Sequence, residues 1–146
     1  MAVAVGLWFF GKRREAFLLA AGLAVSSLIA MPLKLLVPRV RPFHLIPEAR
    51  MLSLEAGYSF PSGHSKNVFL AATVLRNRSI PLTVFLYALA LIVAYSRIYV
   101  GVHWATDVIA GSLIGLAVGQ LILSVQEKLE GAFPFLTKII RKPEER

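Results

Sequence analysis

Asp107 is the only aspartate in this 146-residue sequence, and it lies four residues after His103. If the chain is helical there, the two side chains share a face and can touch. A carboxylate bonded to one nitrogen of an imidazole fixes its tautomer and leaves the other nitrogen free as a nucleophile. This spacing therefore predicts a histidine that can accept a chemical group.

Two further clusters carry groups that suit an anion. One joins Lys34 to Arg41-Pro42, and the other is the tetrapeptide Pro61-Ser62-Gly63-His64. A helix that begins at Ser62-Gly63 offers free N–H groups and the positive end of its dipole to an oxyanion. Arginine matches phosphate oxygens with a planar fork. We predict a phosphate-binding site formed by Lys34, Arg41, Ser62, Gly63 and Arg97.

Each of these residues also has an ordinary explanation. Lys34 could extend to the lipid headgroups, and Ser62 could simply cap a helix. Arg97 and Asp107 could form a structural ion pair between helices. The joint placement favours a site, because these residues fall at three consecutive junctions on one side of the predicted bundle.

A metal centre is the competing chemical hypothesis. His64, His103 and Asp107 could form a set of two histidines and one carboxylate. The neighbouring lysine and arginines argue against it, since they would repel a dication and attract phosphate. The absence of cysteine excludes disulfides and thiolate metal sites.

Long apolar runs lie around and between the three clusters. Hydrophobic residues make up 57% of the chain and charged residues 16%, against about 45–50% and about 25% in soluble proteins. Segments 16–37, 80–95 and 108–125 approach the length of a membrane-spanning helix. A further segment runs from Pro61 to Leu75, and residues 1–10 are too short to span alone. We predict a single all-α domain over residues 1–146, a polytopic transmembrane helical bundle.

The formal net charge of +8 does not indicate a nucleic-acid partner, because the basic residues cluster at the ends of the spans. Residues 12–14, Arg76 with Arg78, and the basic tail 126–146 fall on one side of the threaded bundle, as the positive-inside rule requires. The three motifs fall on the other side. We therefore predict a protein of the cytoplasmic membrane with its site at the extracytoplasmic face.

Two other features bear on the architecture. The loop 43–58 mixes apolar and charged residues and could form a lid over the site. Gly111, Gly115 and Gly119 recur every four residues and form a small-residue face for close helix contact in membranes. This face could also join two copies of the chain.

The three clusters resemble the signature of the type 2 phosphatidic acid phosphatase family. Its motifs are Lys, six residues, Arg-Pro; Pro-Ser-Gly-His; and Ser-Arg, five residues, His, three residues, Asp. The matches run from Lys34 to Asp107, the predicted catalytic core, and cover about half of the chain. The superfamily includes lipid phosphate phosphatases, bacterial undecaprenyl-diphosphate phosphatases, soluble acid phosphatases and vanadium haloperoxidases.

This resemblance implies a role for each residue. His103 would attack phosphorus and form a phosphohistidine, Asp107 would orient it, and His64 would protonate the leaving group and then activate water. Lys34, Arg41, Ser62, Gly63 and Arg97 would hold the phosphoryl oxygens, with no metal or other cofactor. Membrane members usually have six spans, and we expect the difference from this sequence to lie before the catalytic core.

The resulting hypothesis is a membrane lipid phosphatase. Its substrate would be undecaprenyl diphosphate, phosphatidic acid or phosphatidylglycerol phosphate, with the bilayer as its surroundings. Two alternatives stay open: a vanadate-dependent peroxidase on the same fold, and a non-enzymatic protein that binds or transports lipid phosphates.

Overall fold

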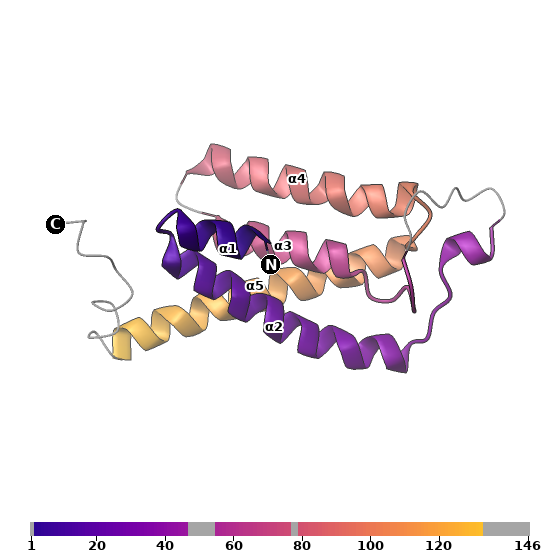
Figure 1. The fold of residues 1–146 in the computed structure, drawn as a ribbon, viewed down its shortest axis with the longest axis horizontal. Helices are drawn as coiled ribbons and strands as arrows, with labels where there is room; N and C mark the ends of the chain where they lie inside the picture. The colour runs from indigo at the N-terminus through magenta and orange to yellow at the C-terminus, as the bar shows by residue number, and fades with distance from the viewer. Residues whose placement is uncertain (1, 47–54, 77–78, 133–146) are drawn as a thin grey trace.

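A computed structural model describes residues 2–46, 55–76 and 79–132 of the chain. Its elements in order are α1 (Ala2–Phe9), α2 (Arg13–Leu36), the 3-10 helix η1 (Pro42–His44), α3 (Gly63–Leu75), α4 (Ile80–Tyr99) and α5 (Ala105–Ala132). All regular structure in the described ranges is helical, and the long helices run roughly along one axis (Figure 1). The predicted all-α bundle is confirmed.

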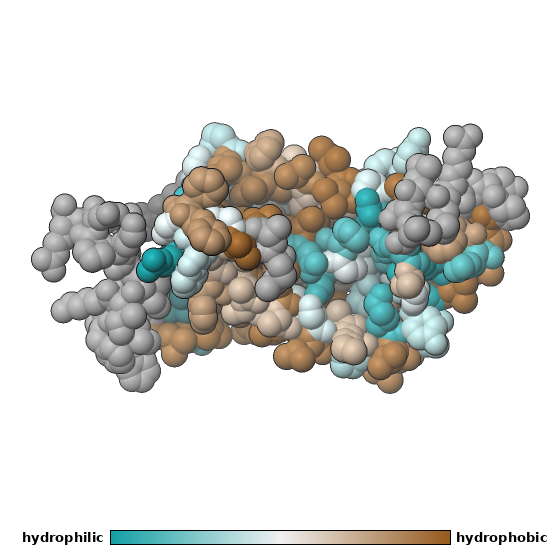
Figure 2. Space-filling view, viewed as in Figure 1, coloured by the Kyte–Doolittle hydropathy of each residue, from teal (hydrophilic) through white to brown (hydrophobic). Residues whose placement is uncertain are grey.

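Helices α2, α4 and α5 are long and apolar enough to cross a membrane. Helix α4 is the least covered of the three. Only 11% of its apolar stretch is buried inside the protein, against 28% of that of α2 and of α5. Hydrophobic residues cover much of the surface that Figure 2 shows, and hydrophilic residues gather toward one end. The chain therefore exposes apolar helix surfaces, as a membrane protein does.

Helix α3 agrees with the predicted segment from Pro61 to Leu75. It has 13 residues, which give a length of about 20 Å at a rise of about 1.5 Å per residue. The hydrocarbon core of a bilayer is about 30 Å thick. Helix α3 is thus a partial-length helix that is enclosed by the others.

Close packing against α5 fixes the position of α3. A Cβ atom added at Gly111 would lie 2.4 Å from the carbonyl oxygen of Ser62, and one at Gly115 would lie 2.2 Å from that of Lys66. Only a hydrogen atom fits at these two positions, so the glycines allow the two backbones to touch. The expected close helix contact is confirmed.

The partner in this contact is α3 of the same chain, which corrects the expectation that the glycine face joins two copies. At the third position, a Cβ atom on Gly119 would lie 2.7 Å from that of Thr73 on α3. All three glycines are therefore covered from within the chain, and a second copy cannot reach this face.

Helix α3 also connects two apolar clusters. Leu70 packs into a cluster that includes Leu19 of α2 and Val118 of α5. Phe69 packs into a second one that includes Ala90 of α4 and Val108 of α5. Because neighbouring residues of α3 are held by different helices, its orientation is fixed on two sides.

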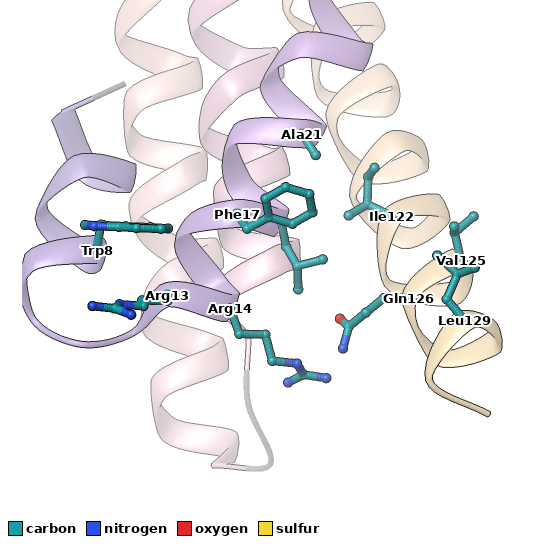
Figure 3. A pocket seen from close by; sticks show the side chains of 10 residues that line it. Trp8, Arg13, Arg14, Phe17, Ala21, Ile122, Val125, Gln126 and Leu129 are labelled. Atoms are coloured by element: carbon teal, nitrogen blue, oxygen red, sulfur yellow. The ribbon is translucent and has the colours of Figure 1, made fainter. Parts of the chain in front are cut away.

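The three sequence motifs meet at one end of the bundle. The end of α2, the start of α3, the end of α4 and the start of α5 lie together there, beside η1 (Figure 1). The opposite end holds α1 and a pocket of about 400 Å³ whose lining is mostly apolar (Figure 3). The predicted placement of the motifs on one side is therefore confirmed.

Candidate active site

Asp107 is held in a fixed orientation at the start of α5. Its side chain is fully buried. Oδ2 accepts a hydrogen bond of 2.9 Å from the backbone N–H of Trp104, which is the bond that an acidic residue at the third helical position makes back to the helix start. Oδ1 accepts a bond of 2.9 Å from Nη1 of Arg39. Both carboxylate oxygens are thus anchored.

His103 precedes α5 rather than lying on its face. Its side chain is 2% exposed, and its Nδ1 lies 3.8 Å from Oδ2 of Asp107. This distance brings the two groups together but is too long for a hydrogen bond. Nδ1 has no hydrogen-bond partner within the described residues. The predicted pair is therefore brought together by the turn before the helix, and a small movement would complete its hydrogen bond.

Arg39 is a residue of this end that motif reasoning missed. Besides Asp107, its guanidinium bonds to the hydroxyl of Thr106 and lies 5.1 Å from the centre of the Trp104 ring. Asp107 therefore pairs with Arg39 and not with Arg97, the partner considered from the sequence. Its spacing from Arg41 could have identified Arg39 from the sequence. In an extended segment, side chains two residues apart leave the chain on the same side.

Ser62 caps α3, which is the alternative to phosphate binding that the sequence allowed for this residue. Its Oγ accepts hydrogen bonds from the backbone N–H of Ser65 at 3.4 Å and from its hydroxyl at 3.0 Å. The N–H of Ser62 donates to the carbonyl of Asp107 at 3.0 Å, which ties the starts of α3 and α5 together. Gly63 and His64 follow in the first turn, where backbone N–H groups lack acceptors within the helix. This helix start is exposed at the same end as His103.

One carboxylate collects the other charged groups of this end. Oε2 of Glu55 lies 2.7 Å from Nη1 of Arg41 and 3.4 Å from Nε2 of His103. Oε1 lies 3.4 Å from Nδ1 of His64 and 3.6 Å from Nη1 of Arg97. The Glu55 side chain is 15% exposed. Four of the predicted site residues, from four separate segments, thus converge on one oxyanion.

Burial alone would raise the pKa of Glu55, but the charges of His103, Arg41 and His64 outweigh it. The pKa of this carboxyl therefore lies below its usual range. Glu55 is thus ionised at neutral pH, and its carboxylate carries a negative charge among these cationic groups. Sequence reasoning missed Glu55, because no motif spacing connects it with the residues that surround it.

Arg41 and Lys34 hold the segment that carries Glu55. Arg41 is 3% exposed, and its guanidinium donates to the carbonyls of Gly57 at 2.9 Å and of Ala56 at 3.2 Å. Nζ of Lys34 donates to the carbonyl of Tyr58 at 2.7 Å. The expected lid 43–58 lies partly outside the described residues, but its last four residues are fixed against the site.

The arrangement of the side chains bears on the competing metal hypothesis. Among the described residues, no three His, Cys, Asp or Glu side chains are grouped as ligands for a metal ion. His64 and His103 both face Glu55, and the two cations Arg41 and Arg97 face it as well. This setting suits an anion more than a dication, and metal independence stays a prediction.

Comparisons with known proteins agree with this arrangement. A model of the PAP2 superfamily matches residues 15–130. The undecaprenyl-diphosphatase of Sulfolobus acidocaldarius is 35% identical over 126 residues, which cover 82% of this chain and 60% of the relative. Phosphatidylglycerophosphatase B of Bacillus subtilis is 30% identical, over 88% of this chain and 66% of the relative.

A solved structure is similar over most of the chain. The crystal structure of Aquifex aeolicus LpxE superposes with a TM-score of 0.77 and 30% sequence identity, covering 84% of this chain and 74% of that one. This chain spans 60 to 66% of the length of the two curated relatives named above. The matched residues include all three motifs and the four helices that bring them together, and the chain belongs to the PAP2 superfamily.

Proposed function

We propose that this chain is the catalytic part of a membrane lipid phosphatase that works through a phosphohistidine. The observation that carries the proposal is the convergence of Arg41, Arg97, His64 and His103 on one carboxylate, at 2.7 to 3.6 Å. A phosphoryl group is also an oxyanion, and it carries more charge and more oxygens than a carboxylate. The names of the two curated relatives, which act on lipid phosphates, support the same conclusion.

In the first step, Nε2 of His103 attacks phosphorus, and the bond from phosphorus to the leaving oxygen breaks; this oxygen belongs to the lipid alcohol of a monophosphate or to the lipid monophosphate released from a diphosphate. His64 gives its proton to the departing oxygen. Asp107 accepts the Nδ1–H of His103 and stabilises the charge that the imidazole gains. Arg41 and Arg97 bind the equatorial oxygens, on which the charge of the transition state is spread.

In the second step, His64 removes a proton from water, and this water attacks the phosphohistidine. The bond from phosphorus to Nε2 breaks, inorganic phosphate leaves and His103 is regenerated. The same His64 thus acts as acid and then as base. Apart from the substrate and this water, every group in the scheme is a side chain of the chain.

The proposed substrate is a phosphorylated lipid because the site lies at the end of long apolar helices. Helix α4 in particular is apolar and little covered. Undecaprenyl diphosphate and phosphatidylglycerol phosphate are named or implied by the curated relatives, and phosphatidic acid remains a third candidate.

The test is phosphate release from purified protein in detergent, measured across these mono- and diphosphate lipids. We expect release from at least one of them, without added metal and in the presence of EDTA. Loss of activity in EDTA that a divalent ion restores would contradict the mechanism. Vanadate should inhibit release as a transition-state analogue, whereas vanadate-dependent halide oxidation would support the peroxidase alternative.

We also propose that the site faces the extracytoplasmic side, on the positive-inside argument. The chain has no cysteine, so single cysteines can report its orientation. Leu45→Cys places an exposed thiol at the site end, and Glu127→Cys places one at the opposite end. In intact cells an impermeant thiol reagent should label the first and spare the second. The reverse pattern would place the substrate in the cytoplasmic leaflet.

A further inference from the structure

Glu55 occupies the point at which a substrate phosphoryl group would bind. Its Oε2 lies 3.4 Å in front of Nε2 of His103, the atom that must approach phosphorus in the proposed mechanism. The same carboxylate takes the hydrogen bond of 2.7 Å from Arg41 that a phosphoryl oxygen would need. His103 cannot form a bond to phosphorus while this carboxylate is in place.

The fit of the carboxylate is incomplete. Oε1 is buried and has no hydrogen-bond partner within the described residues. It lies 3.4 Å from Nδ1 of His64 and 3.6 Å from Nη1 of Arg97. A carboxylate has two oxygens and one charge, whereas a phosphoryl group offers three oxygens and up to two charges. The donors at this site are therefore better satisfied by phosphate than by Glu55.

The segment behind Glu55 is anchored independently of its carboxylate. Arg41 binds the backbone of Ala56 and Gly57, and Lys34 binds that of Tyr58. Gly57 has a φ of +75°, a conformation that glycine adopts without strain. The carboxylate can thus be removed by mutation or turned away while the stem 56–58 stays in place.

We propose that Glu55 is an internal competitor for the phosphoryl site, which every phosphorylated ligand must displace before it binds. This inference rests on the proposed function, because it assigns the displaced position to a substrate phosphate. Occupation of the site by Glu55 lowers the apparent affinity for all such ligands by one common factor. This factor is the fraction of molecules in which the carboxylate has left the site. Free phosphate is then kept out, while a lipid concentrated in the bilayer can still bind.

The sharpest test is Glu55→Gln, which keeps the size of the side chain and removes its charge. We expect three constants to fall by the same factor, about tenfold or more: KM for a lipid substrate, KM for p-nitrophenyl phosphate, and Ki for inorganic phosphate. The value of kcat should stay within about twofold. A fall in kcat with unchanged KM would instead make Glu55 a catalytic acid or base and overturn the proposal.

Two controls separate occupation of the site from a general effect of charge. Glu127→Gln removes an exposed carboxylate at the opposite end and should change none of the three constants. The measurements are repeated in about 0.5 M salt, where long-range attraction is screened. An effect of Glu55→Gln that disappears in salt would overturn the proposal, since direct occupation persists there.

Binding of inorganic phosphate, followed by calorimetry, makes the inference independent of turnover. Glu55→Gln should bind phosphate about tenfold more tightly than the wild type, even if no lipid on the panel is hydrolysed. In that case the proposed function fails and the competition stands. Equal affinities in an active enzyme would remove the competition and leave the function intact.

Glu55→Asp covers the case in which the glutamine variant does not fold. It keeps the charge but draws the carboxylate back by roughly 1.5 Å, one carbon–carbon bond. We expect phosphate affinity between those of the wild type and Glu55→Gln. An affinity at or below that of the wild type would contradict the proposal.

Discussion

Each end of the helical bundle carries an arginine stacked on a tryptophan, but the two contacts differ in what surrounds them. At the site end, Arg39 lies 5.1 Å from the ring centre of Trp104 and also bonds to the buried Asp107. At the opposite end, Arg13 lies 5.3 Å from the ring centre of Trp8 and borders an apolar pocket (Figure 3). The same two residue types thus contact a buried polar cluster at one end of the bundle and lie on an exposed surface at the other.

This difference shows that convergence of buried polar groups, rather than pocket volume, marks the candidate site. The pocket at the opposite end has space for a ligand, but its lining is mostly apolar and provides few polar groups to bind a reacting group. At the site end Arg41, His103 and Asp107 are almost fully buried. Buried charges are costly unless they are paired, so those retained there are held by bonds between segments far apart in sequence.

His103→Ala should have the largest effect of all changes at the site end. It removes the proposed nucleophile, for which no other side chain can substitute, and we expect turnover to fall by about 10⁴-fold or more. The circular dichroism spectrum and the unfolding temperature should stay close to those of the wild type. Radiolabelled phosphate should be trapped on the wild type and not on this variant. Full activity of purified His103→Ala would exclude the mechanism.

The two arginine–tryptophan contacts can be compared directly. Arg39→Ala frees Oδ1 of Asp107, so we expect a misaligned His103 and a fall in kcat on the order of 10- to 100-fold with a nearly unchanged KM. Arg13→Ala removes the same kind of contact at the other end and should leave kcat unchanged. Equal losses in both variants would mean that Arg39 acts on stability alone.

Gly115→Ala tests the packing that positions the site. Its new Cβ would lie 2.2 Å from the carbonyl oxygen of Lys66, and backbone cannot move as easily as a flexible side chain. We expect a loss of about 1–3 kcal/mol in stability and lower activity, because α3 must shift away from α5. Gly6→Ala in α1 meets nothing within 4 Å, and it should leave the unfolding temperature unchanged or raise it. An unchanged unfolding temperature in Gly115→Ala would contradict this contact.

Much of this arrangement could be predicted because its signals are local. Apolar runs marked α2, α4 and α5, and the alternation of basic groups placed the three motifs at one end. Gly111 and Gly115 marked a close contact, but a pattern of small residues does not say which helix approaches it. The start of α3 could be predicted from Pro61-Ser62, and its end at Leu75 matches that of the predicted segment.

Other features had no local signal. Glu55 is an ordinary acidic residue of a loop until the fold brings it to Arg41 and His103, and Arg39 is one of several basic residues near the site. Glu55 and Arg41 are 14 residues apart in sequence, and Arg39 and Asp107 are 68 apart, so only the packed structure identifies these contacts. Such residues have roles that depend on tertiary contacts, whereas motif residues can be found by their spacing.

The smallest predicted effect concerns the pH dependence of stability at the site end. Because the charges of His103, Arg41 and His64 outweigh burial, the pKa of Glu55 in the folded protein lies below its usual value. A carboxyl of this kind contributes stability above its unfolded pKa, about 4.3, and loses that contribution as the pH falls through the lower folded pKa. The wild type should therefore unfold at a higher temperature than Glu55→Gln at pH 6, and the gap should narrow as the pH falls below about 4.3. Glu127→Gln, which changes an exposed carboxylate at the opposite end, should show no comparable narrowing. If the gap between the wild type and Glu55→Gln instead widened in acid, the ionised Glu55 would be destabilising, and its neighbours would not be compensating for its burial.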